Sequence, residues 1–202
     1  MIGRKRRDAG QAFPIYVVMV AGLLFLVFAF FAVGKAAALR NGAQGAADAA
    51  ALAAAQQTRE DFEAPFLASL PGDMLEQFLQ AHVVTGCSAA QGLAAANQAD
   101  VTNCRWTPDG YRDRFTVQVK GLKPVDSSVI PGSKKTFAEP EATAIVEFRC
   151  PGWQALDFND DGVKDLYIFQ CRGAGMVEIA PSSPPPWSQV SKILYDVHLV
   201  DN

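Results

Sequence analysis

FPIYVVMVAGLLFLVFAFFAV, residues 13–33, is a run of 21 residues without a charged side chain, and it determines the architecture of the chain. A helix of this length is roughly 31 Å long, which matches the hydrocarbon core of a bilayer. Fourteen of its residues are Leu, Ile, Phe or Val, and together they favour insertion by roughly 4 to 8 kcal/mol. A buried core helix of this length would show a polar face. The stretch therefore predicts one transmembrane helix, at residues 13–34.

The flanks of this run predict how the chain is oriented. Four cations occupy positions 4–7, whereas only Lys35 and Arg40 follow the run closely. The positive-inside rule therefore places residues 1–12 in the cytoplasm as a basic tail and the rest of the chain outside the cell. The tail carries +3, four cations less Asp8, so the total of −3 leaves −6 on the exported part. Such a charge gives no reason to expect a nucleic-acid partner.

Removal of the span by signal peptidase is the main alternative to retention as an anchor. Ala36, Ala37 and Ala38 offer the small residues that such a cleavage needs, and the mature chain would then begin at Leu39. Signal peptides have shorter apolar cores, however, of about 7 to 15 residues. We therefore expect the span to be retained.

An alanine-rich segment follows the span. Residues 36–55 contain twelve alanines, and alanine has the highest helix propensity, so the helix should continue to about residues 58–62 as a stalk, residues 35–62. Small residues recur on one face at a spacing of four, which would let a second backbone approach closely; they are Ala38, Gly42, Ala46, Ala50 and Ala54. The alternative interpretation is helical filler of low complexity.

Residues 63–202 form the predicted head, an α+β domain of short helices and an antiparallel sheet. Asp73, with Glu76 three residues later, suggests the N-cap of a short helix that stops near Gly86, and a second helix should span residues 88–97. Strands are expected at 101–106 and 111–120, joined by a turn at 107–110, and again at 144–150 and 190–200. Residues 121–140 should form a loop, and residues 181–187 an extended proline-rich segment.

All four cysteines lie in the head, where an exported chain forms disulfides. Three connectivities exist, and we favour Cys87 with Cys104 and Cys150 with Cys171, because each pair encloses one local unit. No pair shows the close spacing of a structural zinc site. The sequence thus predicts two structural disulfides.

The segment LRNGAQGAADAAALA, residues 39–53, preceded by Gly10-Gln11-Ala12 and the apolar span, resembles bacterial Tad (Flp-type) pilus-assembly proteins of the TadE/TadG-like group. The resemblance covers residues 8–57. It implies a basic tail, one membrane helix and an extracellular head with a pilin-like outline, whose partners would be pilins or other Tad assembly proteins.

Processing is where the chain departs from Tad pseudopilins, which are cut after a glycine and carry glutamate at the fifth mature position. Gly10 and Gln11 would flank such a cut, but the fifth residue is then Ile15. The departure indicates an uncut, anchored accessory protein rather than a major pilin.

The acidic segment DFNDDGVKD, residues 157–165, has the spacing of a calcium-binding loop. The side chains of Asp157, Asn159, Asp161 and Asp165 and the carbonyl of Val163 would bind Ca²⁺. It resembles the loops of FG-GAP-type and dockerin-like modules. Hairpin turns gather the same residues without metal, through local hydrogen bonds. Calcium is the only cofactor that the sequence suggests.

The sequence does not suggest an enzyme. It has no nucleophile elbow, no zinc-protease motif, no phosphate-binding loop and no dinucleotide fingerprint, and no small-molecule substrate is evident. We expect a single-pass protein of the cell membrane that takes part in Tad pilus assembly through helix and head contacts. The alternative is an anchored extracellular adhesin or ligand-binding module with a structural calcium loop.

Overall fold

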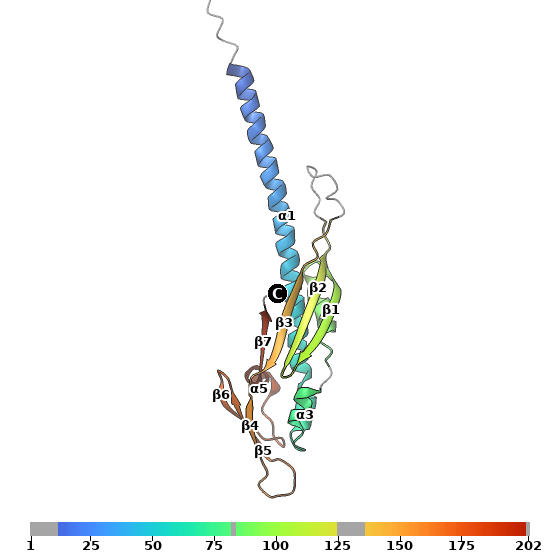
Figure 1. Ribbon diagram of the computed structural model, residues 1–202, viewed down its shortest axis with the longest axis vertical. Helices are drawn as coiled ribbons and strands as arrows, with labels where there is room; N and C mark the ends of the chain where they lie inside the picture. The colour runs from blue at the N-terminus through green and yellow to red at the C-terminus, as the bar shows by residue number, and fades with distance from the viewer. Residues whose placement is uncertain (1–11, 82–83, 125–135, 201–202) are drawn as a thin grey trace, which may run out of the picture.

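The structure is a computed structural model that describes residues 12–81, 84–124 and 136–200. Helix α1 (Ala12–Asp61) runs through the molecule as one unbroken rod, and its first half projects from the head (Figure 1). In the described residues it is the one helix long and apolar enough to cross a membrane. Its side chains from Phe13 to Val33 are largely exposed, because no other part of the described chain covers them. The predicted end of the helix, near residues 58–62, is confirmed.

The second half of α1 lies against a four-stranded antiparallel sheet of order β1-β2-β3-β7 (Figure 1). Alternate residues of strand β2, Phe115, Val117 and Val119, are fully buried, as expected for the side chains that face the helix. The strands are β1 (Ala99–Asp109), β2 (Arg112–Gly121), β3 (Glu141–Phe148) and β7 (Tyr195–Val200).

Four short helices complete this layer: α2 (Glu63–Ser69), α3 (Leu75–Gln80), α4 (Cys87–Ala96) and α5 (Trp187–Leu194). Helix α4 packs along α1 and against β1. At the membrane-distal end of α1, an aromatic cluster fills the core; it includes Phe62, Phe66, Phe78, Trp187 and Tyr195. The fold is therefore α+β, as predicted.

A second, three-stranded antiparallel sheet lies at the far end of the head from the span (Figure 1). It consists of β4 (Gly152–Leu156), β5 (Leu166–Cys171) and β6 (Gly175–Ile179). The acidic loop connects β4 to β5 and so lies at this distal end.

Two sequence-based expectations are wrong in detail. Residues 190–194 belong to helix α5 and not to a strand, because Trp187, Val190 and Leu194 are buried at helical spacing. The β1–β2 turn is two residues later than expected, at Gly110 and Tyr111, and Gly110 has a positive φ of 61° that suits glycine. Part of the predicted loop, residues 125–135, and residues 1–11 of the basic tail lie outside the described residues, so these predictions are not tested.

Asp73 does not cap a helix. Its φ is positive, at 55°, and helix α3 begins after Met74 without a side-chain cap. The Asp73 carboxylate instead accepts a hydrogen bond from the Tyr167 hydroxyl, at 3.0 Å. A contact with a strand almost a hundred residues away thus replaces the local cap.

Candidate functional site: the anchor helix and its junction with the head

Helix α1 changes its surroundings abruptly at Ala43. Residues before it are mostly exposed, whereas one side of the helix after it is fully buried in the head. The buried residues are alanines, whose single methyl groups let α1 approach the sheet and α4 closely; they are Ala46, Ala47, Ala50, Ala51, Ala54 and Ala55, all at 0% exposure. The alanine-rich segment thus forms the centre of the head core.

This arrangement divides the small-residue stripe that the sequence predicts. Ala46, Ala50 and Ala54 are buried inside the head of their own chain, while Ala38 and Gly42 are exposed on the part of α1 nearer the span. Gly45 is exposed as well. The small residues of α1 that remain available to a partner helix therefore lie at Gly45 and on its amino-terminal side.

Gly42 and Gly45 are not required by the packing of the head. A Cβ atom added at either position would meet nothing within 4 Å. Each glycine nevertheless costs about 1 kcal/mol relative to alanine inside a helix. The head alone gives no reason for these two glycines.

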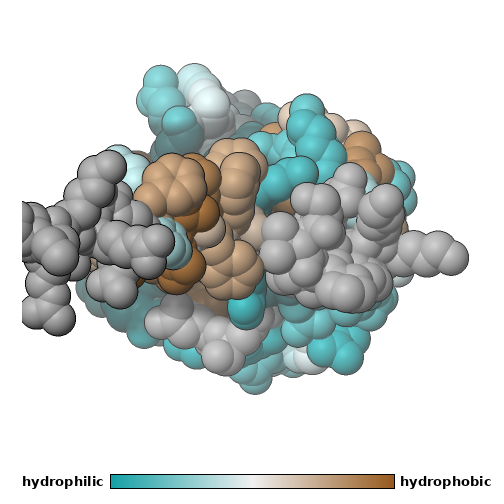
Figure 2. All heavy atoms as spheres, turned by 90° about the horizontal axis from the view of Figure 1, so that it is seen from above, coloured by the Kyte–Doolittle hydropathy of each residue, from teal (hydrophilic) through white to brown (hydrophobic). Residues whose placement is uncertain are grey.

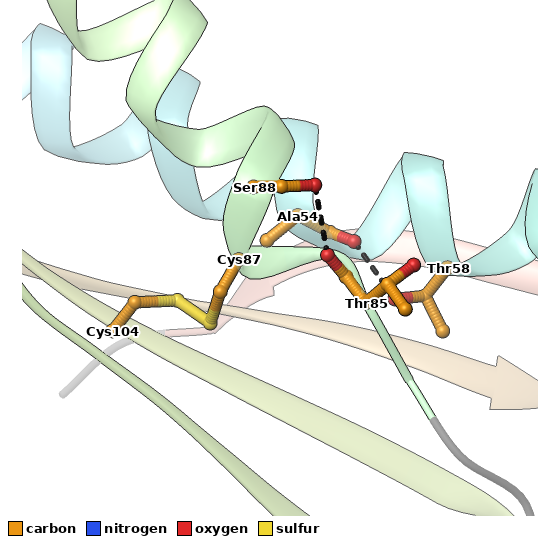
Figure 3. Close-up of a disulfide and its surroundings, with 6 residues drawn as sticks. All are labelled: Ala54, Thr58, Thr85, Cys87, Ser88 and Cys104. Atoms are coloured by element: carbon orange, nitrogen blue, oxygen red, sulfur yellow. Dashed lines mark hydrogen bonds between the residues drawn. A yellow bond between two sulfur atoms is a disulfide. The ribbon is translucent and has the colours of Figure 1, made fainter.

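Gly86 shows the opposite situation, at the start of α4. A Cβ atom there would lie 2.1 Å from the Ala54 carbonyl oxygen and 2.5 Å from Thr58 Oγ1. The Thr58 hydroxyl donates to the Ala54 carbonyl at 3.0 Å, and Thr85 and Cys87 flank the same contact (Figure 3). The sequence suggested only a helix stop at Gly86, since a close approach between distant segments leaves no local signal.

Two disulfides link elements of the head, with the pairing that the sequence favours. Cys87–Cys104 ties the start of α4 to β1, and Cys150–Cys171 ties the end of β3 to β5. The second bond joins the two sheets. Both are structural links of the kind that stabilise small exported domains.

At residues 36–44, α1 is mostly exposed, but the end of the head nearest the span lies beside it. Two shallow pockets flank the helix there, of about 210 and 470 Å³. The first is lined by Ala38 and Gly42 of α1 together with Leu122 and Lys123. The second brings Ala36 and Ala138 together. Both are open to solvent, so neither has the enclosed shape of a substrate site.

The acidic loop forms a network of its own hydrogen bonds. Gly162 N donates to Asp157 Oδ2 at 2.9 Å, and Val163 N donates to Asp161 Oδ1 at 2.8 Å. Phe158 N donates to Asp165 Oδ2 at 2.8 Å. Across the residues that the structure describes, no group of three or more His, Cys, Asp or Glu side chains is placed to hold a metal ion.

One oxygen of the loop stands apart from this network. Asp157 Oδ1 is shielded from solvent and has no hydrogen-bond partner. The side-chain amide of Asn159 donates to Asp161 Oδ2, at 2.9 Å, and not to Asp157 Oδ1. A carboxylate oxygen buried in this way is costly unless a donor or a cation meets it.

Two buried tyrosines in the described part of the head have raised pKa values. Burial, reinforced by the nearby Asp113 carboxylate, raises the pKa of Tyr195 well above its usual value. Asp113 itself accepts a hydrogen bond from Trp106 Nε1 at 2.6 Å. Burial also raises the pKa of Tyr167, and so does its bond to Asp73. All of these groups lie in the packed core rather than in a cleft, which fits a structural role.

These features define a class: an α+β head built on the second half of a helix whose first half can cross a membrane. Residues 10–57 match the family described as "Putative Flp pilus-assembly TadE/G-like". The match confirms the resemblance seen in the sequence and covers α1 almost to its end. No curated protein and no solved structure matches the chain.

Proposed function

We propose that this chain is a membrane-anchored component of a Tad (Flp-type) pilus-assembly apparatus that acts by contact and not by catalysis. The match of residues 10–57 to the Tad family carries this proposal. The matched segment coincides with α1, so the family resemblance lies in the anchor and the core helix together. The head then presents its surfaces at a fixed distance from the membrane.

The exposed glycines of α1 support a contact role for the helix. Gly42 and Gly45 lie where the helix leaves the head, and their positions have room for a side chain that the chain itself does not fill. Small residues on an exposed helix face let a second helix approach closely. We expect a helix of a pilin or of another assembly protein to pack there.

The division of the chain that we propose follows from the same helix. Residues 1–12 remain in the cytoplasm, residues 13–34 cross the membrane, and the head lies outside the cell. Gly10 and Gln11, the candidate processing site, lie outside the described residues. Because Ile15 replaces the glutamate of pseudopilins, we expect the mature protein to keep its tail.

Complementation tests the proposal. Cells that lack the gene should assemble fewer pili, and the unchanged gene should restore them. A variant with Gly42→Leu and Gly45→Leu should reach the membrane in normal amount but fail to restore pili, because the leucines block the partner helix.

Gly92→Leu provides the matched control. Gly92 is an exposed glycine of α4, and a Cβ atom there also meets nothing within 4 Å. This variant should restore pili fully. Normal pilus numbers in cells without the gene would contradict the proposed role. Full restoration by the double variant would contradict only the proposed helix contact at Gly42 and Gly45.

A second candidate function, an adhesin or ligand-binding module with a structural calcium loop, is favoured by the unpaired Asp157 Oδ1 atom. Three carboxylates, an amide and a carbonyl form the oxygen-rich donor set that Ca²⁺ prefers. Extracellular modules bind it with dissociation constants of about 10⁻⁴ to 10⁻³ M. Bound calcium would rigidify the β4–β5 loop at the distal tip.

Calcium titration of the melting temperature tests this candidate. At 10 mM Ca²⁺, a site with a dissociation constant of about 1 mM adds about 1.4 kcal/mol of stability. Asp157→Asn should abolish the effect, whereas Asp160→Asn, which removes a neighbouring charge outside the ligand set, should retain it. Equal responses of the two variants, or no response of the unchanged protein, would exclude the site.

A further inference from the structure

We propose that the head is seated directly on the lipid headgroups through a membrane-facing rim, which consists of Arg40, Lys120, Leu122, Lys123 and Phe137. The partner of this surface is the phospholipid bilayer, with a preference for anionic lipid. The proposal rests on the membrane anchoring proposed above.

The height of the rim follows from the continuity of α1. Because the helix does not break between the span and the head, the distance along it is about 1.5 Å per residue. Ala36 and Ala38 are therefore about 3 to 6 Å beyond Gly34, the last residue of the predicted span. The headgroup layer on each side of the hydrocarbon core is about 5 to 7 Å thick. Ala36 and Ala38 thus lie within that layer.

The head reaches the same height. Ala138 lines one pocket with Ala36 and the other with Ala38, and Leu122 and Lys123 line the second of these as well. Gly121 is close to α1, since a Cβ atom there would lie 3.6 Å from the Ala43 Cβ. Viewed from above, apolar side chains are surrounded by hydrophilic ones over much of the visible surface (Figure 2).

The composition of the rim suits a membrane interface. Leu122, directly after β2, is 52% exposed and would place an apolar side chain at the level of the headgroups. The Lys120 ammonium lies 4.8 Å from the centre of the Phe137 ring and 3.3 Å from the Glu139 carboxylate. A lysine with a long apolar stem can keep its ammonium at the headgroup level while the stem lies along apolar surface.

The remaining cations give the rim its preference for anionic lipid. Arg40 and Lys123 are exposed, and no carboxylate in the described part of the chain forms a salt bridge with either of them. A basic side chain near an anionic membrane surface contributes about a fivefold gain in association. Phosphate groups at the surface would take the place of the missing carboxylates.

The experiment uses the full chain in lipid nanodiscs. One set contains phosphatidylcholine alone, and the other contains an equal mixture with phosphatidylglycerol. A fluorophore is attached at Leu122→Cys in one sample and at Met176→Cys in another, and the discs contain a lipid with a quencher on its headgroup. Met176 is 72% exposed on β6, in the sheet farthest from the span (Figure 1).

We expect strong quenching at position 122 and little at position 176, with more quenching at 122 in the anionic discs. Arg40→Glu combined with Lys123→Glu should lower the association of the rim with the lipid headgroups, measured by quenching at position 122. We expect a decrease of at least about fivefold in anionic discs and a smaller one in neutral discs. If alkaline carbonate does not extract the protein but quenching is similar at both positions, the contact between the rim and the lipid is contradicted, while membrane anchoring by α1 is not. Extraction by carbonate would overturn the anchor and the seating together.

Discussion

Tyr167 and Tyr195 are both buried, but their hydroxyl groups differ in their partners. The single proton of the Tyr167 hydroxyl is shared between the Leu70 carbonyl, at 2.8 Å, and the Asp73 carboxylate, at 3.0 Å, whereas the Tyr195 hydroxyl has no hydrogen-bond partner. Tyr167→Phe should therefore lower the free energy of unfolding by about 1 to 3 kcal/mol, because the Leu70 carbonyl loses its donor. Tyr195→Phe should be neutral or stabilising. Denaturant unfolding of the detergent-solubilised protein measures both, and equal losses would contradict this account.

The same tyrosines predict how stability depends on pH. The pKa values of Tyr167 and Tyr195 are raised in the folded state by burial, so folding favours the neutral phenol. Below about pH 10, the ordinary pKa of tyrosine, both states are protonated and this contribution is constant. Above it the unfolded state loses protons first, and stability falls as pH rises. Tyr195→Phe should make that fall less steep, and unchanged steepness would show that Tyr195 does not contribute.

At the scale of elements, the contact between α1 and α4 depends on Gly86. Gly86→Ala should destabilise the head by about 1 to 3 kcal/mol, because the added methyl group meets the Ala54 carbonyl and Thr58, which have little room to move. Gly92→Ala, on the same helix, should stabilise it by up to about 1 kcal/mol. Thermal unfolding of the two variants distinguishes close packing from simple helix propensity. A loss of similar size in both would argue against the contact.

The elements that the sequence predicted well are those with local signals. The β1–β2 hairpin follows from Gly110 between two strands of alternating residues, and α4 lies within one residue of its predicted bounds. Helix α5 was missed because the β-rich composition of residues 190–200 concealed the helical spacing of Trp187, Val190 and Leu194. The close approach at Gly86 could not be predicted, since it depends on Ala54, more than thirty residues earlier.

At the scale of the whole molecule, the sequence predicted a helix that leaves the membrane but not what covers it. Alanine content gives helix propensity; it does not say which face is buried. The structure shows that Ala46, Ala50 and Ala54 are enclosed by the head of the same chain. The candidate contact surface is therefore shorter than the stripe suggested, and it ends at the junction with the head.

The orientation of the whole molecule is the remaining prediction, and it can be tested by protease protection. The four cations at positions 4–7 should hold the amino terminus in the cytoplasm. Protease added to intact cells, after the outer layers are made permeable, should then digest the head and leave an amino-terminal tag intact. Replacing these four residues by glutamate leaves Lys35 and Arg40 as the cations nearest the span, so a fraction of the chains should invert. Digestion of the tag in the unchanged protein would show the opposite orientation and would place the head, with both disulfides, in the reducing cytoplasm.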